Sequence, residues 1–248
     1  MLNAMRASFY KMFRDKAFGL CLIGTAGWAL VVIMAQVLTS HARGIEDVSQ
    51  LANRWYGFIG LHVIEVPLII SAVLLFSGEF RDRSWKLLIA KGISKTSYFL
   101  SKLVSMLCLT VILSFISILT LAICNVILLH ATMDAAYVGN VIKFFLGETL
   151  AHFSIAVLVI ALICIIKRGE IASIISLFLM VFGYVMLSGV EKALSLGEVI
   201  TDFWAFSQTA FVEFNGPVAW GRILISFLGY LVICSLAAIA FLSRKDID

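Results

Sequence analysis

The stretch that decides the fold is LVSMLCLTVILSFISILTLAICNVILLH, residues 103–130, which contains no Asp, Glu, Lys, Arg, Gly or Pro. A helix rises about 1.5 Å per residue, so roughly 20 apolar residues cross a hydrocarbon core about 30 Å thick. This run is longer than that and nothing in it breaks a helix. It predicts a transmembrane helix, because backbone polar groups in lipid must be satisfied within the segment itself.

The composition extends this prediction to the whole chain. Of the 248 residues, 62% are hydrophobic and 14% are charged, whereas a soluble domain carries about 25% charged residues. A water-soluble core of this size cannot hide so much apolar surface. We therefore expect an all-α integral membrane protein that forms one transmembrane domain over residues 1–248. Six runs are long enough to span: Ala17–Ser40, Phe58–Gly78, Leu103–His130, Ile142–Ile166, Ile171–Val190 and Arg222–Leu242.

The distribution of positive charge predicts the orientation of these spans. The N-terminal segment, residues 77–102, residues 167–168 and the tail together carry 14 of the 19 Lys and Arg residues, and the other connections carry five. Basic segments stay on the cytoplasmic side during insertion. We expect a multi-pass protein of the bacterial plasma membrane with both termini in the cytoplasm.

The N-terminal segment, residues 1–16, has the pattern of an amphipathic helix. Lys11 and Arg14 point away from one apolar face. That face comprises Leu2, Met5, Phe9, Met12 and Phe13. Such a helix lies in the membrane interface with its basic residues toward anionic headgroups. A simple anchor and a surface for docking a partner both fit this pattern.

The segment SGEFRDRSWKLLIAKGISKTSYFLSK, residues 77–102, concentrates six of the basic residues of the chain. Its apolar positions spread around the helical wheel, which favours a short helix with contacts on several sides over a one-sided surface helix. Gly92 is expected to end that helix, and Ser94 or Thr96 to begin the next. The phosphate-binding pattern G-x-x-x-x-G-K-[ST] is absent from the chain. Any ATP must therefore be bound by another subunit.

This segment resembles the cytoplasmic connection after the second span of type-2 ABC exporter permeases. The resemblance rests on Glu79, Ser84, Leu87–Leu88, the turn Gly92-Ile93-Ser94-Lys95 and the closing Lys102. The chain departs from the family pattern where Arg83-Ser84 replaces Gly-Thr and where Gly92 replaces a frequent Pro. The plan of six spans also resembles that of the family, so the resemblance covers the whole chain.

The resemblance implies that residues 79–102 form a coupling helix that docks on an ATP-binding cassette subunit. The residues expected to couple are Glu79, Arg81, Arg83, Ser84, Trp85, Lys86, Leu87, Leu88 and Lys91. It implies a dimeric exporter subunit without catalytic residues, metal or cofactor of its own, since the partner binds ATP and Mg. The expected partners are that ATPase, a second permease copy or a related permease, and the lipid bilayer, with no nucleic acid. Similarity to small antibiotic and peptide exporters implies an amphipathic peptide or drug-like cargo.

The external segment, residues 191–220, alternates aromatic and acidic residues. It is too polar to span the membrane and too aromatic to be fully hydrated. Amphipathic helices that lie in or dip into the outer interface fit this pattern, as in the re-entrant external helices of the family, and so does a simple aromatic belt.

Four ionisable residues lie within predicted spans, at similar depths in the outer half: His62, Glu65, Glu148 and His152. Charge is costly in the bilayer, so such groups face protein or water. Three interpretations remain open, namely polar contacts between helices, the lining of an export path, and a metal site. The last leaves an intramembrane metal-dependent enzyme as an alternative function, and the two carboxylates alone leave a proton-coupled secondary transporter.

Overall fold

The chain is described from a computed structural model that covers residues 2–42, 64–129, 133–195 and 199–244. These residues form helices, and the one β-interaction among them is an isolated antiparallel bridge between Val212 and Val218. In chain order the helices are α1 (Leu2–Arg14), α2 (Lys16–Ala42), α4 (Glu65–Phe76), α5 (Gly78–Arg81), α6 (Ser84–Ala90), α7 (Lys95–Leu129), α8 (Ala135–Ile166), α9 (Gly169–Leu194), α10 (Val199–Asp202), the 3₁₀-helix η1 (Ala205–Phe211) and α11 (Trp220–Arg244).

Five of the predicted spans are helices long and apolar enough to cross a membrane. They are α2, α7, α8, α9 and α11. Of the second span, predicted over residues 58–78, the structure describes the part that forms α4. The protein is therefore an α-helical membrane protein, as predicted.

The helices extend beyond the predicted apolar runs because hydropathy detects only the part of a helix that matches hydrocarbon. The third predicted span starts at Leu103, whereas α7 already begins at Lys95. The fourth was predicted from Ile142, but α8 begins at Ala135, where the carboxylate of Asp134 accepts a hydrogen bond from the backbone N–H of Tyr137 at 2.7 Å. Such an N-cap replaces one of the hydrogen bonds that the first turn cannot make within the helix.

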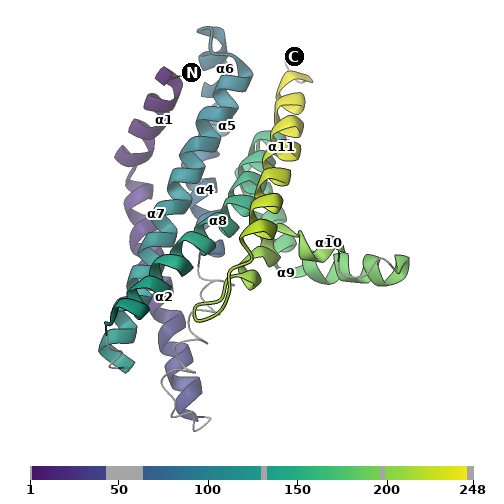
Figure 1. The fold of residues 1–248 in the computed structure, drawn as a ribbon. Coiled ribbons are helices and arrows are strands. Elements are labelled where there is room, and N and C mark those ends of the chain that lie inside the picture. The colour runs from purple at the N-terminus through teal and green to yellow at the C-terminus, as the bar shows by residue number, and fades with distance from the viewer. Residues whose placement is uncertain (1, 43–63, 130–132, 196–198, 245–248) are drawn as a thin grey trace.

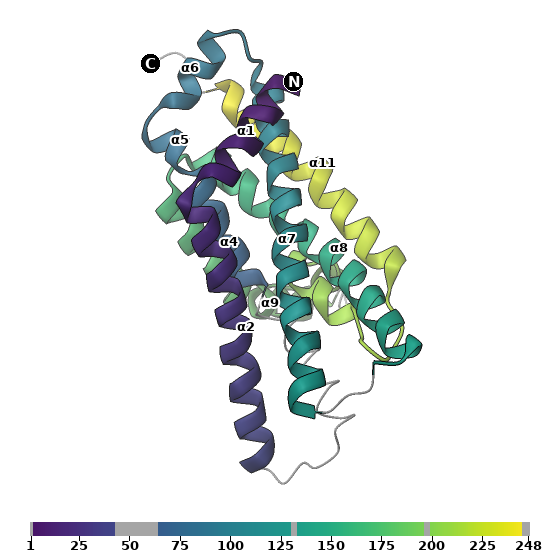
Figure 2. The same ribbon diagram turned by 90° about the vertical axis from the view of Figure 1, so that its left-hand side faces the viewer.

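The start of α1, the α5–α6 connection and the end of α11 lie at the same end of the bundle (Figures 1 and 2). From this end α2 runs to the opposite end (Figure 2). The chain comes back to the first end through α4, which ends at Phe76 directly before α5. After α6, the helix α7 runs beside α2 and in the same direction (Figure 2). The two ends of the described chain therefore share a side with the basic connection.

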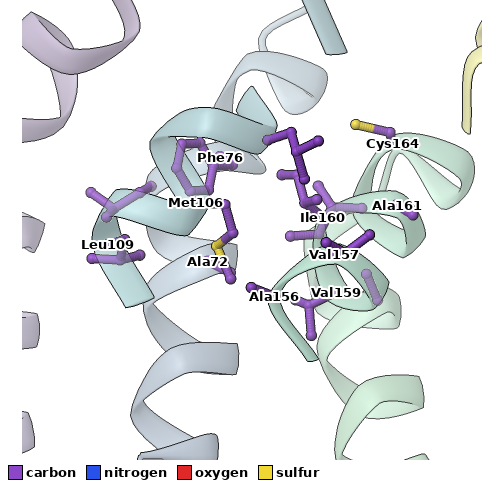
Figure 3. Packing of buried hydrophobic residues seen from close by; sticks show 14 of the residues in the cluster. Ala72, Phe76, Met106, Leu109, Ala156, Val157, Val159, Ile160, Ala161 and Cys164 are labelled. Carbon is purple, nitrogen blue, oxygen red and sulfur yellow. The ribbon is translucent and has the colours of Figure 1, made fainter. Parts of the chain in front are cut away.

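The centre of the bundle is formed by α4, α7 and α8, whose small and medium-sized side chains interlock (Figure 3). Ala72 and Phe76 on α4 pack with Met106 on α7 and with Ile160 on α8, and all four are buried. In the spanning window of α8, 67% of the residues are buried, against 17% in α9 and in α11. Thus α8 is the central helix, while α9 and α11 present most of their apolar surface outward.

The segment predicted to be external, residues 191–220, folds against the bundle. Its α10 and η1 pack on α9, α8 and α11. The Glu191 carboxylate accepts hydrogen bonds from the backbone N–H groups of Ile200 and Thr201 and from the Thr201 hydroxyl. Arg222 binds Asp202 at 3.2 Å. The helices expected here are thus a four-residue α10 and a 3₁₀ turn held by side-chain contacts.

Candidate functional site

The basic connection between α4 and α7 is built from two short helices with sharply defined ends. Arg83 has a left-handed backbone, with φ of 55°, and joins α5 to α6. After α6, Gly92 has φ of 90°, and the N–H groups of Gly92 and Ile93 donate to the carbonyls of Ile89 and Leu88. This is the Schellman arrangement that favours glycine, which confirms Gly92 as the end of the helix.

Ser94 is the N-cap residue directly before α7, and the sequence had predicted Ser94 or Thr96 for this role. Its hydroxyl oxygen accepts a hydrogen bond from the backbone N–H of Ser97 at 3.1 Å, which is the position an N-cap serves. The chain therefore leaves α6 and enters α7 through a turn of only a few residues.

Glu79 holds this connection to the rest of the bundle. Its side chain is 6% exposed, and its Oε1 accepts hydrogen bonds from the ammonium groups of Lys102 at 2.7 Å and Lys11 at 3.1 Å. Its Oε2 accepts one from the hydroxyl of Tyr98 at 2.9 Å. One carboxylate on α5 thus joins α1 and two successive turns of α7.

The two lysines keep this carboxylate charged. Burial alone would raise the pKa of Glu79, but the ammonium groups of Lys102 and then Lys11 outweigh burial, so the pKa of Glu79 is lowered. The Lys102 side chain is only 4% exposed. A buried ammonium and a buried carboxylate each need the other, because either one alone would be an uncompensated charge.

Trp85 attaches the connection to a third place in the bundle. Its side chain is buried, its ring centroid lies 5.9 Å from that of Phe80, and the ammonium of Lys167 lies 4.4 Å from its ring centroid. That distance is typical of a cation–π contact. Lys167 lies in the turn between α8 and α9, so α6 contacts that turn, while α5 contacts α1 and α7 through Glu79.

The first residue of α9 also lies against the junction of α4 and α5. A Cβ atom added at Gly169 would lie 2.3 Å from the Cβ of Ser77. Only a glycine permits this approach, so α9 begins in direct contact with the base of the basic connection.

The structure divides the predicted coupling residues into three groups. Glu79 and Trp85 are buried and bind the connection to the bundle, and Ser84 and Leu88 are partly buried. The remaining five are exposed: Arg81, Arg83, Lys86, Leu87 and Lys91. The connection therefore has an inner side that is fixed to other helices and an outer side that is basic and accessible.

Sequence analysis missed part of the inner side. Lys11 was predicted to face lipid headgroups but reaches Glu79, Tyr98 was not singled out, and Lys167 was counted only among the basic residues that predict the topology. Lys102 was recognised as part of the motif without a partner. An ionisable residue at the edge of a long apolar run, such as Lys102, is the signal that could have prompted a search for a buried carboxylate.

Three of the four ionisable residues predicted within spans can be placed, while His62 lies outside the described residues. Glu65, Glu148 and His152 are 1%, 0% and 0% exposed. The His152 Nδ1 atom lies 2.7 Å from the carbonyl oxygen of Glu148 and 3.4 Å from its Oε2. Glu65 on α4 and Glu148 on α8 lie close enough to interact electrostatically.

This polar group is enclosed between packed helices. Among the described residues, no three or more His, Cys, Asp or Glu side chains have an arrangement that could hold a metal ion. Glu148 and His152 have no accessible surface, and the contact between them lies within α8.

The fold and the site together define a class of protein: a multi-span helical membrane protein with a basic connection fixed to several spans at one end. A family model described as "ABC-2 family transporter protein" matches residues 4–186, which include most of α1, the basic connection and most of α9. A search of curated proteins gave no match. The chain belongs to the ABC-2 transporter family, as its resemblance to type-2 ABC permeases predicted.

Family membership makes the protein a membrane subunit of an ABC transporter. Permeases of this family are generally non-catalytic and work with an ATP-binding cassette partner. The matched residues contain the whole Glu79 site.

Proposed function

We propose that this chain is the permease subunit of an ATP-driven exporter and that α5 and α6 transmit work from a separate ATP-binding subunit. The observation that carries the proposal is the set of contacts made by Glu79, which joins the connection to α1 and α7. A lever needs an accessible end and a fixed end. The exposed basic residues and the buried Glu79 supply both within a short segment.

Movement of the α5–α6 connection would reach several helices at once. Glu79 on α5 links it to α7 and to α1, and the Trp85–Lys167 contact links α6 to the α8–α9 turn. In the proposed cycle, ATP-driven closure of the partner pushes on the outer side of α6. The attached helices then tilt and open the path outward.

The proposed topology has six spans with both termini in the cytoplasm. The described chain starts and ends on the side of the basic connection, and α2 leaves this side while α4 returns to it, so a sixth crossing ending in α4 completes the count. The excess of Lys and Arg on this side supports its cytoplasmic assignment. The proposed domain covers residues 1–248, with an interfacial helix over 1–16, the coupling segment over 79–102 and an external segment over 191–220.

Six spans supply half of a transport path, so we propose that two copies, or this chain and a related permease, face each other across it. The cargo proposed is an amphipathic peptide or a drug-like compound. ATP and Mg belong to the partner subunit in this scheme. Glu65, Glu148 and His152 contribute interhelical contacts to the permease, which fits their enclosure.

The direct test is affinity purification of the full chain in mild detergent, followed by identification of bound proteins and assay of ATP hydrolysis. The proposal expects a soluble ATP-binding subunit in stoichiometric amount and ATP turnover only in the complex. Transport or catalysis by the isolated chain would contradict it, as would stoichiometric metal in a preparation with enzyme activity.

A further inference from the structure

A cavity of about 660 Å³ lies between α1, α6 and the first turns of α7. Among the described residues, its lining includes the ammonium-bearing residues Lys11, Lys91 and Lys102 and one carboxylate, Glu79. The carboxylate is already bound by Lys11 and Lys102. The lining therefore keeps an excess of positive charge that an anion could neutralise.

Five serines line the cavity: Ser8, Ser84, Ser94, Ser97 and Ser101. The hydroxyls of Ser84, Ser94 and Ser101 donate to the Glu79 carbonyl, the Ser97 hydroxyl and the Tyr98 carbonyl, so Ser8 and Ser97 are the serines placed to donate to a ligand. An ammonium has three N–H donors, so a lysine bound to one carboxylate oxygen retains donors for a second acceptor. Lysine is a common ligand of phosphate, and phosphate oxygens accept several hydrogen bonds at once.

The position of the cavity identifies the source of the anion. Lys11 precedes the span that starts at Lys16, and the turn at Lys91 precedes the span that starts at Lys95. The wall formed by α1 therefore lies at the level where lipid headgroups meet the ends of spanning helices, whereas Lys91 lies farther out, beyond the apolar run that starts at Leu103. Anionic headgroups attract lysines in such positions.

One wall of the cavity is apolar, through Leu87, Leu88 and Ile93. An amphipathic ligand, with a phosphate beside a glycerol and acyl chains, matches this mixture better than a free inorganic ion. We propose that the cavity binds the phosphate group of an anionic phospholipid, which would sit between the interfacial helix and the proposed coupling helix. Leu87 and Lys91 also belong to the residues predicted to couple to the ATP-binding subunit, so the lipid would lie at the edge of that surface.

The test compares lipid binding by matched variants of the full chain in mild detergent, by native mass spectrometry. The protein is equilibrated with equal amounts of phosphatidylglycerol and phosphatidylcholine, and the ratio of retained lipids is measured. Lys91→Gln removes a cavity lysine, whereas Lys86→Gln removes an exposed lysine of α6 that does not line the cavity. Lys91→Arg preserves the charge.

We expect the unmodified protein to retain phosphatidylglycerol preferentially. We expect Lys91→Gln to reduce that preference about fivefold, and Lys86→Gln and Lys91→Arg to leave it unchanged. Lys91 is exposed, so unfolding of the variant is not expected, and an unchanged melting temperature would verify this.

Three results would overturn the assignment. Equal effects of Lys91→Gln and Lys86→Gln would show a diffuse surface attraction. Displacement of the lipid by excess inorganic phosphate would show a site for the free ion. Loss of the lipid on addition of the ATP-binding subunit would show that an acidic group of the partner is the occupant.

Discussion

Replacing Glu79 with alanine is expected to destabilise the protein strongly. The change removes the carboxylate from a Lys102 side chain that is 4% exposed and also leaves Tyr98 and Lys11 without their acceptor. Breaking a buried ion pair by removing one partner costs about 3–5 kcal/mol. A change of that size lowers the melting temperature of a chain of this length by about 10 °C.

Asp82→Asn is the matched control, because it removes a carboxylate that lies three residues away in an exposed ion pair. Arg81 and Asp82 approach to 3.4 Å, but their side chains are 78% and 66% exposed. Such a pair contributes about 0–1 kcal/mol. The control should therefore shift the melting temperature by less than about 4 °C.

The purified variants are heated to a series of temperatures in the same detergent. The protein that remains folded after each step is measured by gel filtration with fluorescence detection, which gives the melting temperature. A Glu79→Gln/Lys102→Met double variant should recover part of the loss, because it removes both buried charges together. If Glu79→Ala cost no more than Asp82→Asn, the carboxylate would not anchor the connection and our reasoning from the structure would fail.

Three further predictions follow from particular residues. Because the pKa of Glu79 is lowered in the folded protein, its stabilising effect should be complete above the ordinary glutamate value of about 4.3 and be lost as the pH falls through the lower folded value. The difference in melting temperature between the unmodified protein and Glu79→Gln should accordingly persist from pH 7 to pH 5 and shrink only in more acidic buffer. Gly92→Ala should cost about 1–2 kcal/mol because φ is 90° there, whereas Gly139→Ala, with open space around it in α8, should not destabilise in the same unfolding assay. The double change Glu65→Gln/Glu148→Gln should leave transport of a fluorescent cargo in proteoliposomes intact, and loss of transport in a folded variant would assign these carboxylates to the path instead.

The sequence was sufficient for the features that depend on local chemistry. Long apolar runs predicted the spanning helices, and the special backbone freedom of Gly92 and the capping hydroxyl of Ser94 predicted where α6 ends and α7 begins. The family resemblance came from the same short stretch. Helix boundaries such as the start of α7 at Lys95 were less well predicted, because a polar turn can continue a helix beyond the hydrocarbon region.

The partners of Glu79 could not be derived from one sequence. Lys11 is 68 positions away along the chain, and the pairing depends on how α1 rotates and packs beside α7. A helical wheel assigns Lys11 to the polar face but does not say whether water, lipid or a carboxylate meets it. For the same reason the enclosure of Glu148 and His152 emerged only from the packing of α4 against α8.

The proposed transmission of work through α6 is tested most directly by reversing the charge of its outer side. The variant Arg81→Glu/Arg83→Glu/Lys86→Glu changes three exposed residues, and Arg81→Lys/Arg83→Lys/Lys86→Arg keeps their charge as a control. Both are purified by affinity from membranes, and the ATP-binding subunit that accompanies them is quantified. We predict that the reversed variant folds but loses the ATP-binding subunit while the control keeps it; full retention by the reversed variant would contradict the account.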